Sequence, residues 1–322
     1  MLKRILFICA AAALLIALSA YYLLWAASGP RPGPHTVIVE SGSGLAKVAA
    51  QLERVGAIPG NATTFRVMDK LFGSGEPIQA GEFSIPRGVG GAEVIDLLRD
   101  GRPVQRLVTI PEGMPSVLVH DRLMREPLLT GPMDVPAEGS VVHDSYSFEL
   151  GETRAAVLGR MQAAMTRELA KAWAARKPTA VVRTPAETVT LASIVEKETG
   201  LPSERRMVAG VYSNRLRVGM KLDADPTVIY PVTKGRPLGR RILRSELNTD
   251  NGYNTYLKPG LPAGPIANPG LSSIKAVLDP EPTQALYFVA RGDGGHVFAN
   301  TLAEHNANVR KWYALRRQRG EM

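Results

Sequence analysis

Glu198 is a carboxylate that could act as a general acid, because it ends the apolar face of a predicted helix. A rotation of about 100° per residue places it on one face with Leu191, Ile194 and Val195, while Glu196 points about 160° away. A carboxyl group held against apolar side chains loses solvation when it ionises, so its pKa rises and it can donate a proton near neutral pH. In the alternative interpretation, Glu198 is solvated at a frayed last turn or is paired with an arginine.

The helix that must position this acid is predicted by its end signals. Thr184, Pro185 and Glu187 form a capping-box start with proline at the first helical position, and Gly200 ends the helix. A second predicted helix follows over residues 205–218. Its apolar positions place Arg215 on the same flank as Tyr212, so this arginine is a candidate for the same site.

Downstream segments carry polar groups that suit a sugar. Residues 220–230 combine Asp223 and Asp225 with a turn and a strand-like run. The two loops at residues 251–256 and 260–270 are rich in amides, tyrosines and glycines. Amides suit sugar hydroxyl and acetamido groups, tyrosines offer apolar faces to sugar rings, and glycines allow close backbone approach; the alternative is that these are ordinary turns.

Metal binding is not expected at the Asp-x-Asp pair. Two aspartates can hold a hard cation beside a phosphate, but no histidine or further acid lies nearby in the sequence to complete an oxygen shell. We therefore predict neither a metal site nor a cofactor.

The N-terminus contains a predicted membrane anchor. An uncharged run of about 23 residues, 5–27, is long enough to cross a hydrocarbon core as a helix. Lys3 and Arg4 precede it and no basic residue follows before Arg31, so the positive-inside rule puts residues 1–4 in the cytoplasm and the remainder outside. A cleaved signal peptide is the alternative, although the run is longer than a typical one.

Composition narrows the possible partners. The net charge is +9 over 322 residues, which fits nucleic acid, anionic lipid or another acidic polymer, but placement outside the cytoplasm argues against nucleic acid. The single cysteine, Cys9, lies inside the predicted span, which excludes a disulfide framework, a cysteine metal site and a thiol nucleophile. Glycine, proline and serine in residues 28–35 predict a short linker.

Three stretches share one pattern and predict small βα units. Residues 37–42, 83–88 and 108–113 each read as an alternating strand with a glycine turn, followed by an amphipathic helix. The first two units resemble a LysM-like fold, which grips N-acetylglucosamine polymers in other proteins; a structural spacer is the alternative. We predict an α+β protein with a LysM-like module at residues 36–106 and a larger α+β catalytic domain at residues 107–322.

Eight motifs carry a resemblance to a known family. They are residues 191–199, 203–205, 211–216, 222–230, 253–256, 260–262, 266–270 and 287–290. In their order and spacing the chain closely resembles the endolytic murein transglycosylases of the YceG-like family, and its anchor and βα units fit that family's layout. The pair Glu198 and Thr199 looks like the Glu-Ser pair of soluble lytic transglycosylases. One departure is residues 143–146, His-Asp-Ser-Tyr, where the family usually has a Pro-Asp-Thr-Tyr-like run.

The resemblance implies a single-pass protein of the inner (plasma) membrane, with its C-terminal domain in the periplasm or its extracytoplasmic equivalent. Its activity would be to cleave the MurNAc-GlcNAc bond within nascent peptidoglycan strands, leave a 1,6-anhydro-MurNAc end and terminate elongation. Glycan strands, the membrane and peptidoglycan synthases are the partners that it implies.

The resemblance also implies a mechanism that needs one acid. The 6-hydroxyl of N-acetylmuramic acid attacks its own anomeric carbon, while Glu198 protonates the glycosidic oxygen and then accepts the hydroxyl proton. Ordinary glycosidases need two carboxylates instead. The expected substrate-binding residues are Asp225, Tyr253, Asn254, Thr255 and Arg215.

Two other functions remain open from the sequence. A peptidoglycan hydrolase that uses water would need a second acid, such as Asp225 or Glu196. A non-catalytic glycan-binding or division-scaffold protein would use the LysM-like module. A binding module has no need of a buried acid such as Glu198.

Overall fold

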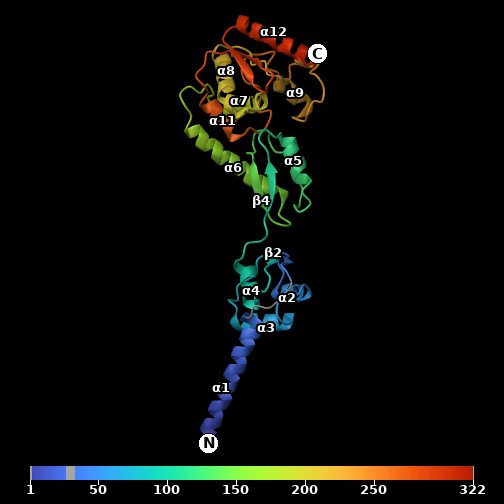
Figure 1. The fold of residues 1–322 in the computed structure, drawn as a ribbon, viewed down its shortest axis with the longest axis vertical. Helices are drawn as coiled ribbons and strands as arrows, with labels where there is room; N and C mark the ends of the chain where they lie inside the picture. The colour runs from blue at the N-terminus through green and yellow to red at the C-terminus, as the bar shows by residue number, and fades with distance from the viewer. Residues whose placement is uncertain (1, 27–32, 322) are drawn as a thin grey trace. The chain divides into compact units, whose positions relative to one another are not determined.

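The computed structural model describes residues 2–26 and 33–321. Most of the predicted linker 28–35 lies outside the described residues, as does the last residue of the predicted span 5–27. The chain divides into two compact units (Figure 1). The first comprises Met1–Arg106 with Ser147–Gly151, and the second comprises Leu107–Tyr146 with Glu152–Met322.

An apolar helix opens the first unit. Helix α1 spans Leu2–Tyr21 and continues as a π-helical segment, η1, over Tyr22–Ala26. The segment Arg4–Tyr21 is long and apolar enough to cross a membrane, and none of it is buried within the protein. At the end of η1, Trp25 is 2% exposed and joins the core of the first unit.

The rest of the first unit is a small β-sheet covered by helices. Strands β1 (His35–Val39) and β2 (Gly81–Ile85) pair antiparallel, with His35 opposite Ile85. Alternation places Val37 and Val39 in the core while Ile38 is exposed. The helices of this unit are α2 (Leu45–Arg54), α3 (Ala62–Phe72) and α4 (Gly91–Asp100).

Both predicted βα units of this part are confirmed, and α3 is an element that the repeat pattern did not predict. Its start has a local cause, because the side chain of Asn61 accepts a hydrogen bond from Thr64 N at 2.9 Å. The LysM-like nature of the unit stays a prediction.

The second unit combines helices with short strands. Strands β3 (Arg106–Ile110) and β4 (Asp144–Phe148) form one two-stranded sheet, and the first unit includes Arg106 of β3 and the last two residues of β4. Strands β5 (Tyr287–Ala290) and β6 (His296–Ala299) form another, antiparallel sheet. The helices are α5 (Ser116–Met124), α6 (Arg154–Ala174), α7 (Pro185–Glu198), η2 (Pro202–Glu204), α8 (Arg205–Arg217), α9 (Asp225–Thr233), α10 (Arg244–Leu247), α11 (Leu271–Leu278) and α12 (Leu302–Gln318).

Helices α7, α8 and α11 group together at the centre of this unit (Figure 1). Helix α7 is buried on every side from Thr188 to Val195, because it also packs against α6 and α9. The two helices predicted around residues 184–200 and 205–218 are confirmed, as is the mixed α+β class.

The strand-like prediction within residues 220–230 was wrong, because Asp225–Thr233 forms helix α9. The β-branched run at residues 227–229 favours a strand locally. Pro226 however occupies the first turn of a helix, where proline is tolerated, and the Thr227 hydroxyl donates to Ala224 O at 2.6 Å. Buried contacts to the loop around Thr255 hold this conformation.

Candidate active site

Helix α7 places Glu198 at its last position. The Thr184 hydroxyl accepts a hydrogen bond from Glu187 N at 3.1 Å, which fixes the start of the helix as predicted. Burial of its middle residues then fixes the rotation of the helix about its axis. Glu198 is only partly exposed, and it borders a cavity of about 410 Å³.

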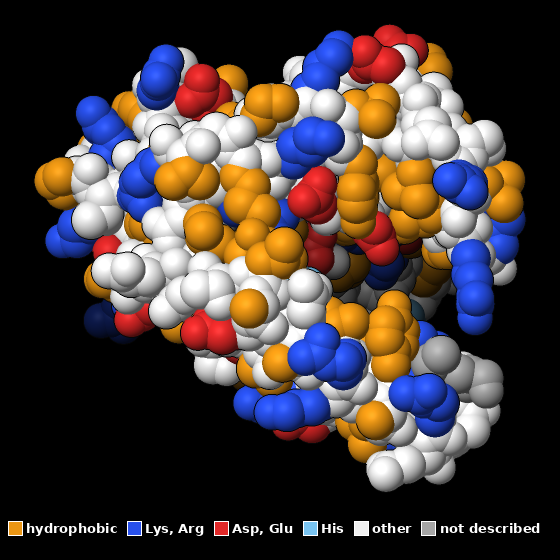
Figure 2. Space-filling view, turned by 90° about the horizontal axis from the view of Figure 1, so that it is seen from above, with side chains coloured by type: hydrophobic (Ala, Val, Ile, Leu, Met, Phe, Trp, Pro, Cys, Tyr) orange, Lys and Arg blue, Asp and Glu red, His pale blue; other side chains and the backbone are white. Residues whose placement is uncertain are grey.

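Segments far apart in the sequence line this cavity. Helix α8 contributes two residues, α12 contributes two, and the others come from α7, the loop before α9, the start of α9, the 256 loop and β5. Figure 2 shows acidic, basic and hydrophobic side chains interspersed on the face seen from above. The lining is Glu198, Tyr212, Arg215, Leu222, Asp223, Asp225, Tyr256, Tyr287, Phe288, Leu302 and His305.

The pKa of Glu198 is raised to about 7. Burial is the main cause, and the negative charge of Asp225 adds to it. A hydrogen bond from the Tyr212 hydroxyl and the positive charge of Arg215 act in the opposite direction. A large fraction of the molecules therefore carry a protonated Glu198 at neutral pH, as the helix geometry had predicted.

Helix α8 supplies Tyr212 and Arg215 from one face. Tyr212 is fully buried, and its ring packs edge-on against Phe288 at 5.8 Å between centroids. Burial and the neighbouring Glu198 charge raise the pKa of the Tyr212 hydroxyl, which therefore stays protonated and donates to the acid. Sequence reasoning placed Tyr212 only in the apolar stripe and missed this role.

Arg215 connects segments of the cavity wall by hydrogen bonds. Its Nη1 donates to Leu222 O at 2.8 Å and its Nε donates to Leu286 O at 2.7 Å. The same guanidinium lies 5.5 Å from the ring centre of Tyr287 and 3.4 Å from a carboxylate oxygen of Asp223. Arg215 is therefore a buried cation that connects the loop before α9 to the start of β5.

Asp225 lies in the same cavity and is held by a tyrosine. The Tyr256 hydroxyl donates to Asp225 Oδ1 at 2.6 Å. Burial and this hydrogen bond raise the pKa of Tyr256, so the hydroxyl remains a donor. A negative charge of fixed orientation therefore faces the site of the acid.

Aromatic side chains of β5 and α12 also line the cavity. The imidazole of His305 stacks on Tyr287 with 5.2 Å between ring centres and 24° between planes. Burial, followed by the charge of Arg215, lowers the pKa of His305. Tyr287 opens one of the eight sequence motifs, but His305 was not singled out from the sequence, because a lone histidine on an amphipathic helix gives no local signal for a site.

Comparisons with known proteins agree with the motifs. The sequence profile of the YceG-like family matches residues 37–311. The chain belongs to the YceG-like family. The resemblance seen in the sequence motifs is thus confirmed.

Curated relatives carry one name. A Bacillus subtilis protein named endolytic murein transglycosylase is 41% identical over 131 residues, which are 41% of this chain and 36% of that protein. A protein of the same name from Streptococcus pneumoniae is 26% identical over 85% of this chain and 57% of its own length. The chain thus spans 36% to 57% of the length of these relatives.

A solved structure of the same family supports the fold. A 2.6 Å crystal structure of a yceG-like protein from Listeria monocytogenes aligns with a TM-score of 0.53 at 27% sequence identity. The alignment covers 85% of this chain and 98% of that one.

Three members of the predicted binding set lie outside the cavity lining. Asn254 is buried, and its Nδ2 donates to Leu247 O at 2.9 Å and Thr249 O at 3.1 Å. The hydroxyl of Thr255 accepts from Ala224 N at 3.1 Å. The structure therefore gives Asn254 and Thr255 contacts within the protein, where they shape the loop that presents Tyr256.

Tyr253 is the third of these residues. Its ring packs against Tyr230 at 5.1 Å between centroids, away from the residues that line the cavity. Glu198, Arg215 and Asp225 are the predicted site residues that the structure brings together.

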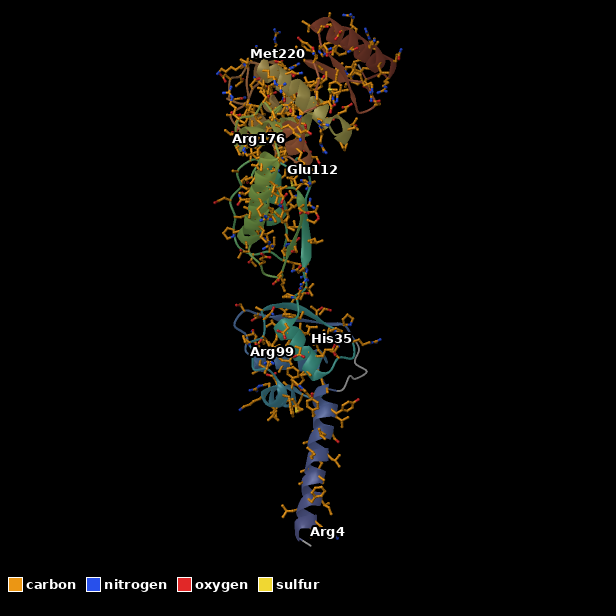
Figure 3. The ribbon with its side chains drawn as sticks, turned by 90° about the vertical axis from the view of Figure 1, so that its left-hand side faces the viewer. Arg4, His35, Arg99, Glu112, Arg176 and Met220 are labelled. Carbon is orange, nitrogen blue, oxygen red and sulfur yellow. The ribbon has the colours of Figure 1, made fainter. Side chains whose placement is uncertain are left out.

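Glu196 faces a different part of the unit, as its position on the helix predicted. Its Oε2 accepts from Gly270 N at 3.0 Å and from Ser273 Oγ at 2.6 Å, and its Oε1 lies 3.6 Å from Arg205. Arg205 also pairs with Glu112, which is labelled in Figure 3, at 2.8 Å. Glu196 thus fastens the end of α7 to the start of α11.

Within residues 2–26 and 33–321, no group of three or more His, Cys, Asp or Glu side chains is arranged to hold a metal. In the Asp-x-Asp pair, Asp223 faces Arg215 and Asp225 accepts from Tyr256.

A larger cavity of about 870 Å³ lies in the first unit. The buried acid in its lining, Asp69, accepts two hydrogen bonds from Arg99, at 2.7 and 3.1 Å. Both carboxylate oxygens of Asp69 are thus occupied by Arg99, so we assign the chemistry to the smaller cavity around Glu198.

Proposed function

We propose that this protein is an endolytic lytic transglycosylase of peptidoglycan that cleaves the MurNAc-GlcNAc bond within glycan strands. The observation that carries the proposal is Glu198, a carboxyl group with a pKa of about 7 that borders a cavity with polar and aromatic walls. The names of the relatives from Bacillus subtilis and Streptococcus pneumoniae support the choice of murein as substrate.

In the first half of the proposed reaction, protonated Glu198 donates its proton to the glycosidic oxygen as the bond to the anomeric carbon breaks. In the second half, the 6-hydroxyl of the same N-acetylmuramic acid attacks that carbon, and the Glu198 carboxylate accepts the hydroxyl proton. The products are a 1,6-anhydro end and a free 4-hydroxyl, with no water consumed. The proton returns to Glu198, so the acid is regenerated.

Neighbouring side chains serve this sequence in distinct ways. Tyr212 donates a hydrogen bond that stabilises the Glu198 carboxylate after proton transfer. The charge of Asp225, oriented by Tyr256, is suited to stabilise positive charge at the anomeric carbon. Tyr287 and Phe288 contribute apolar surface to the cavity lining and help to orient the sugar for the intramolecular attack.

The anchor is part of the same proposal. Helix α1 would fix the protein in the inner (plasma) membrane as a single pass, with both units on the extracytoplasmic side. Cleavage there would act on nascent strands and end their elongation. Peptidoglycan synthases, which make this substrate, are the corresponding partners. For residues 36–106 we propose a LysM-like module, which is supported by the β1-α2-α3-β2 order with antiparallel strands.

A hydrolase is the second candidate, because Asp225 lies in the same cavity as Glu198. In that reaction one carboxyl group protonates the leaving oxygen and the other activates water or acts as the nucleophile. The Tyr256 hydroxyl already donates to Asp225 Oδ1 and so occupies this oxygen, which favours the transglycosylase over activation of water by Asp225.

The masses of the cleavage products distinguish the two reactions. Purified glycan strands are digested with the wild type, Glu198→Gln and Glu196→Gln, and the ends are analysed by mass spectrometry. We expect ends that lack the mass of one water molecule, lost in Glu198→Gln and retained in Glu196→Gln. Reducing ends would identify the hydrolase, and full cleavage by Glu198→Gln would refute the assignment of the acid.

A further inference from the structure

The outer face of helix α3 is apolar although it is exposed. Its inner residues Phe65 and Met68 are buried in the core of the first unit. On the outside, Val67 is 51% exposed, Leu71 66% and Phe72 51%. Val67 and Leu71 are four residues apart and share one face of the helix. We name Val67, Leu71 and Phe72 the outer face of α3.

This face is continuous with the end of the apolar helix α1. The ring of Phe72 packs edge-on against Tyr21, the last residue of α1, with 4.9 Å between centroids. Trp25 of η1 packs against Phe65 on the inner side of α3, at 5.6 Å. Helix α3 lies across the end of α1, at the edge of the module from which α1 leaves (Figure 1). A membrane that contains α1 would therefore end at the level of α3.

The basic residues of α3 are exposed and its acidic residue is buried. Arg66 and Lys70 are exposed, whereas Asp69 is buried and bound by Arg99, whose side chain is labelled in Figure 3. The exposed charges of α3 are therefore positive. Basic residues beside an apolar face are typical of helices that lie in the headgroup region of anionic bilayers.

We propose that the outer face of α3 binds the surface of the bilayer that α1 spans, with Val67, Leu71 and Phe72 among the lipid headgroups and Arg66 and Lys70 facing anionic phosphates. This rests on the proposed membrane anchor. The contact makes α3 a second attachment of the first unit to the membrane, so that the base of the module is held at a fixed depth. Tyr21 lies at the level that interfacial aromatic residues prefer.

Spin labels on the full-length protein in nanodiscs test the proposal. Each variant carries one new cysteine in a Cys9→Ser background. Leu71→Cys probes the outer face and Leu14→Cys probes α1. Val218→Cys in the second unit is the control, because Val218 is 65% exposed and Leu71 is 66% exposed. The readout is the ratio of collision with oxygen, which enriches in lipid, to collision with a water-soluble nickel complex. We expect this ratio to be highest at residue 14, intermediate at residue 71 and lowest at residue 218.

The outcomes separate this contact from the anchor. A lipid-like ratio at residue 14 with a water-like ratio at residue 71 would overturn the contact and leave the anchor intact. Water-like ratios at both positions would overturn both. Shielding of residue 71 from both probes would identify a protein partner such as a second copy, and shielding only after glycan is added would identify a glycan surface. Either result would refute the lipid assignment.

Lipid composition tests the role of the basic residues. Phosphatidylglycerol in the nanodisc should raise the ratio at residue 71 relative to phosphatidylcholine alone. The double substitution Arg66→Gln and Lys70→Gln should remove this dependence while the ratio at residue 14 stays unchanged. An equal response of the double variant and its parent to phosphatidylglycerol would contradict the electrostatic part of the contact.

Discussion

At the scale of single residues, the proposed chemistry depends on the protonation of Glu198. Its buried carboxyl group has a pKa of about 7, so protonated and ionised forms coexist near neutral pH. A group that must first donate and then accept a proton works best when its pKa is close to the pH of its surroundings.

The activity should therefore fall as the pH rises above about 7. Because the first step needs protonated Glu198, we expect kcat/KM on soluble glycan strands to decrease about tenfold per pH unit above a midpoint near 7. The pH profile of the wild type from acid to alkaline conditions measures this midpoint. An activity that rises steadily through the alkaline range would show that the acting group is a base in the free enzyme.

Two neighbours should move that midpoint in opposite directions. The Tyr212 hydrogen bond lowers the pKa of Glu198, so Tyr212→Phe should shift the alkaline limb to higher pH. The Asp225 charge raises that pKa, so Asp225→Asn should shift the limb to lower pH, whatever it does to the maximal rate. Shifts of the same sign in both variants would refute this electrostatic arrangement.

The same raised pKa makes a prediction about stability. An acid with a higher pKa in the folded state than in the unfolded state destabilises the fold as pH rises from about 4.5 to about 7. Glu198→Gln should therefore stabilise the protein by an amount that is near zero at low pH and grows to the order of 3 kcal/mol above pH about 7. Denaturant unfolding at several pH values measures it. A gain that is independent of pH would contradict the prediction.

At the scale of elements, the end of α7 is fixed by Glu196 rather than by Glu198, the proposed catalytic acid. The Glu196 carboxylate accepts from Gly270 N and Ser273 Oγ at the start of α11. This contact sets the position of the last turn of α7, which also carries Glu198. A structural acid and a chemical acid thus lie two residues apart on different faces of one helix.

The substitution Glu196→Gln should lower stability by about 1–3 kcal/mol, because buried donors lose a charged acceptor. The midpoint of the alkaline limb of activity should not move, since Glu196 does not line the cavity. Glu187→Gln in the exposed first turn of the same helix is the matched control, with a loss of about 1 kcal/mol or less. A changed midpoint in Glu196→Gln would place this residue in the chemistry.

At the scale of the whole molecule, the two compact units carry separate cores. The first unit contains the ion pair between Asp69 and Arg99, in which both side chains are buried. The second contains α7 and the cavity around Glu198. We expect each core to melt as its own cooperative unit.

The variant Arg99→Met tests this division. It leaves Asp69 buried without its partner, which typically costs about 3–5 kcal/mol. Calorimetry of the full-length protein in detergent should show two transitions, of which only one moves to lower temperature. Cleavage of soluble glycan strands should persist at temperatures below the lowered transition. A joint shift of both transitions would show that the two cores unfold together.

The sequence by itself determined what depends on neighbours along the chain. The Thr184 N-cap of α7, the placement of Glu198 and Glu196 on different faces, and the strand and helix of each βα unit were all predicted correctly. The second half of the predicted capping box was not, because the Glu187 side chain accepts from Arg183 N. Capping and helical periodicity act over a few residues, so they can be read from a short segment. The apolar run of α1 was found for the same reason.

Only the tertiary structure decided which distant side chains meet Glu198. It brought Tyr212, Tyr256 and His305 to the cavity and turned Asn254 and Thr255 into the protein. It also made residues 225–233 a helix where local propensity favoured a strand. The direction of a loop side chain depends on packing between segments far apart in sequence, which no local pattern records. The sequence therefore located the acid, and the fold selected the groups that surround it.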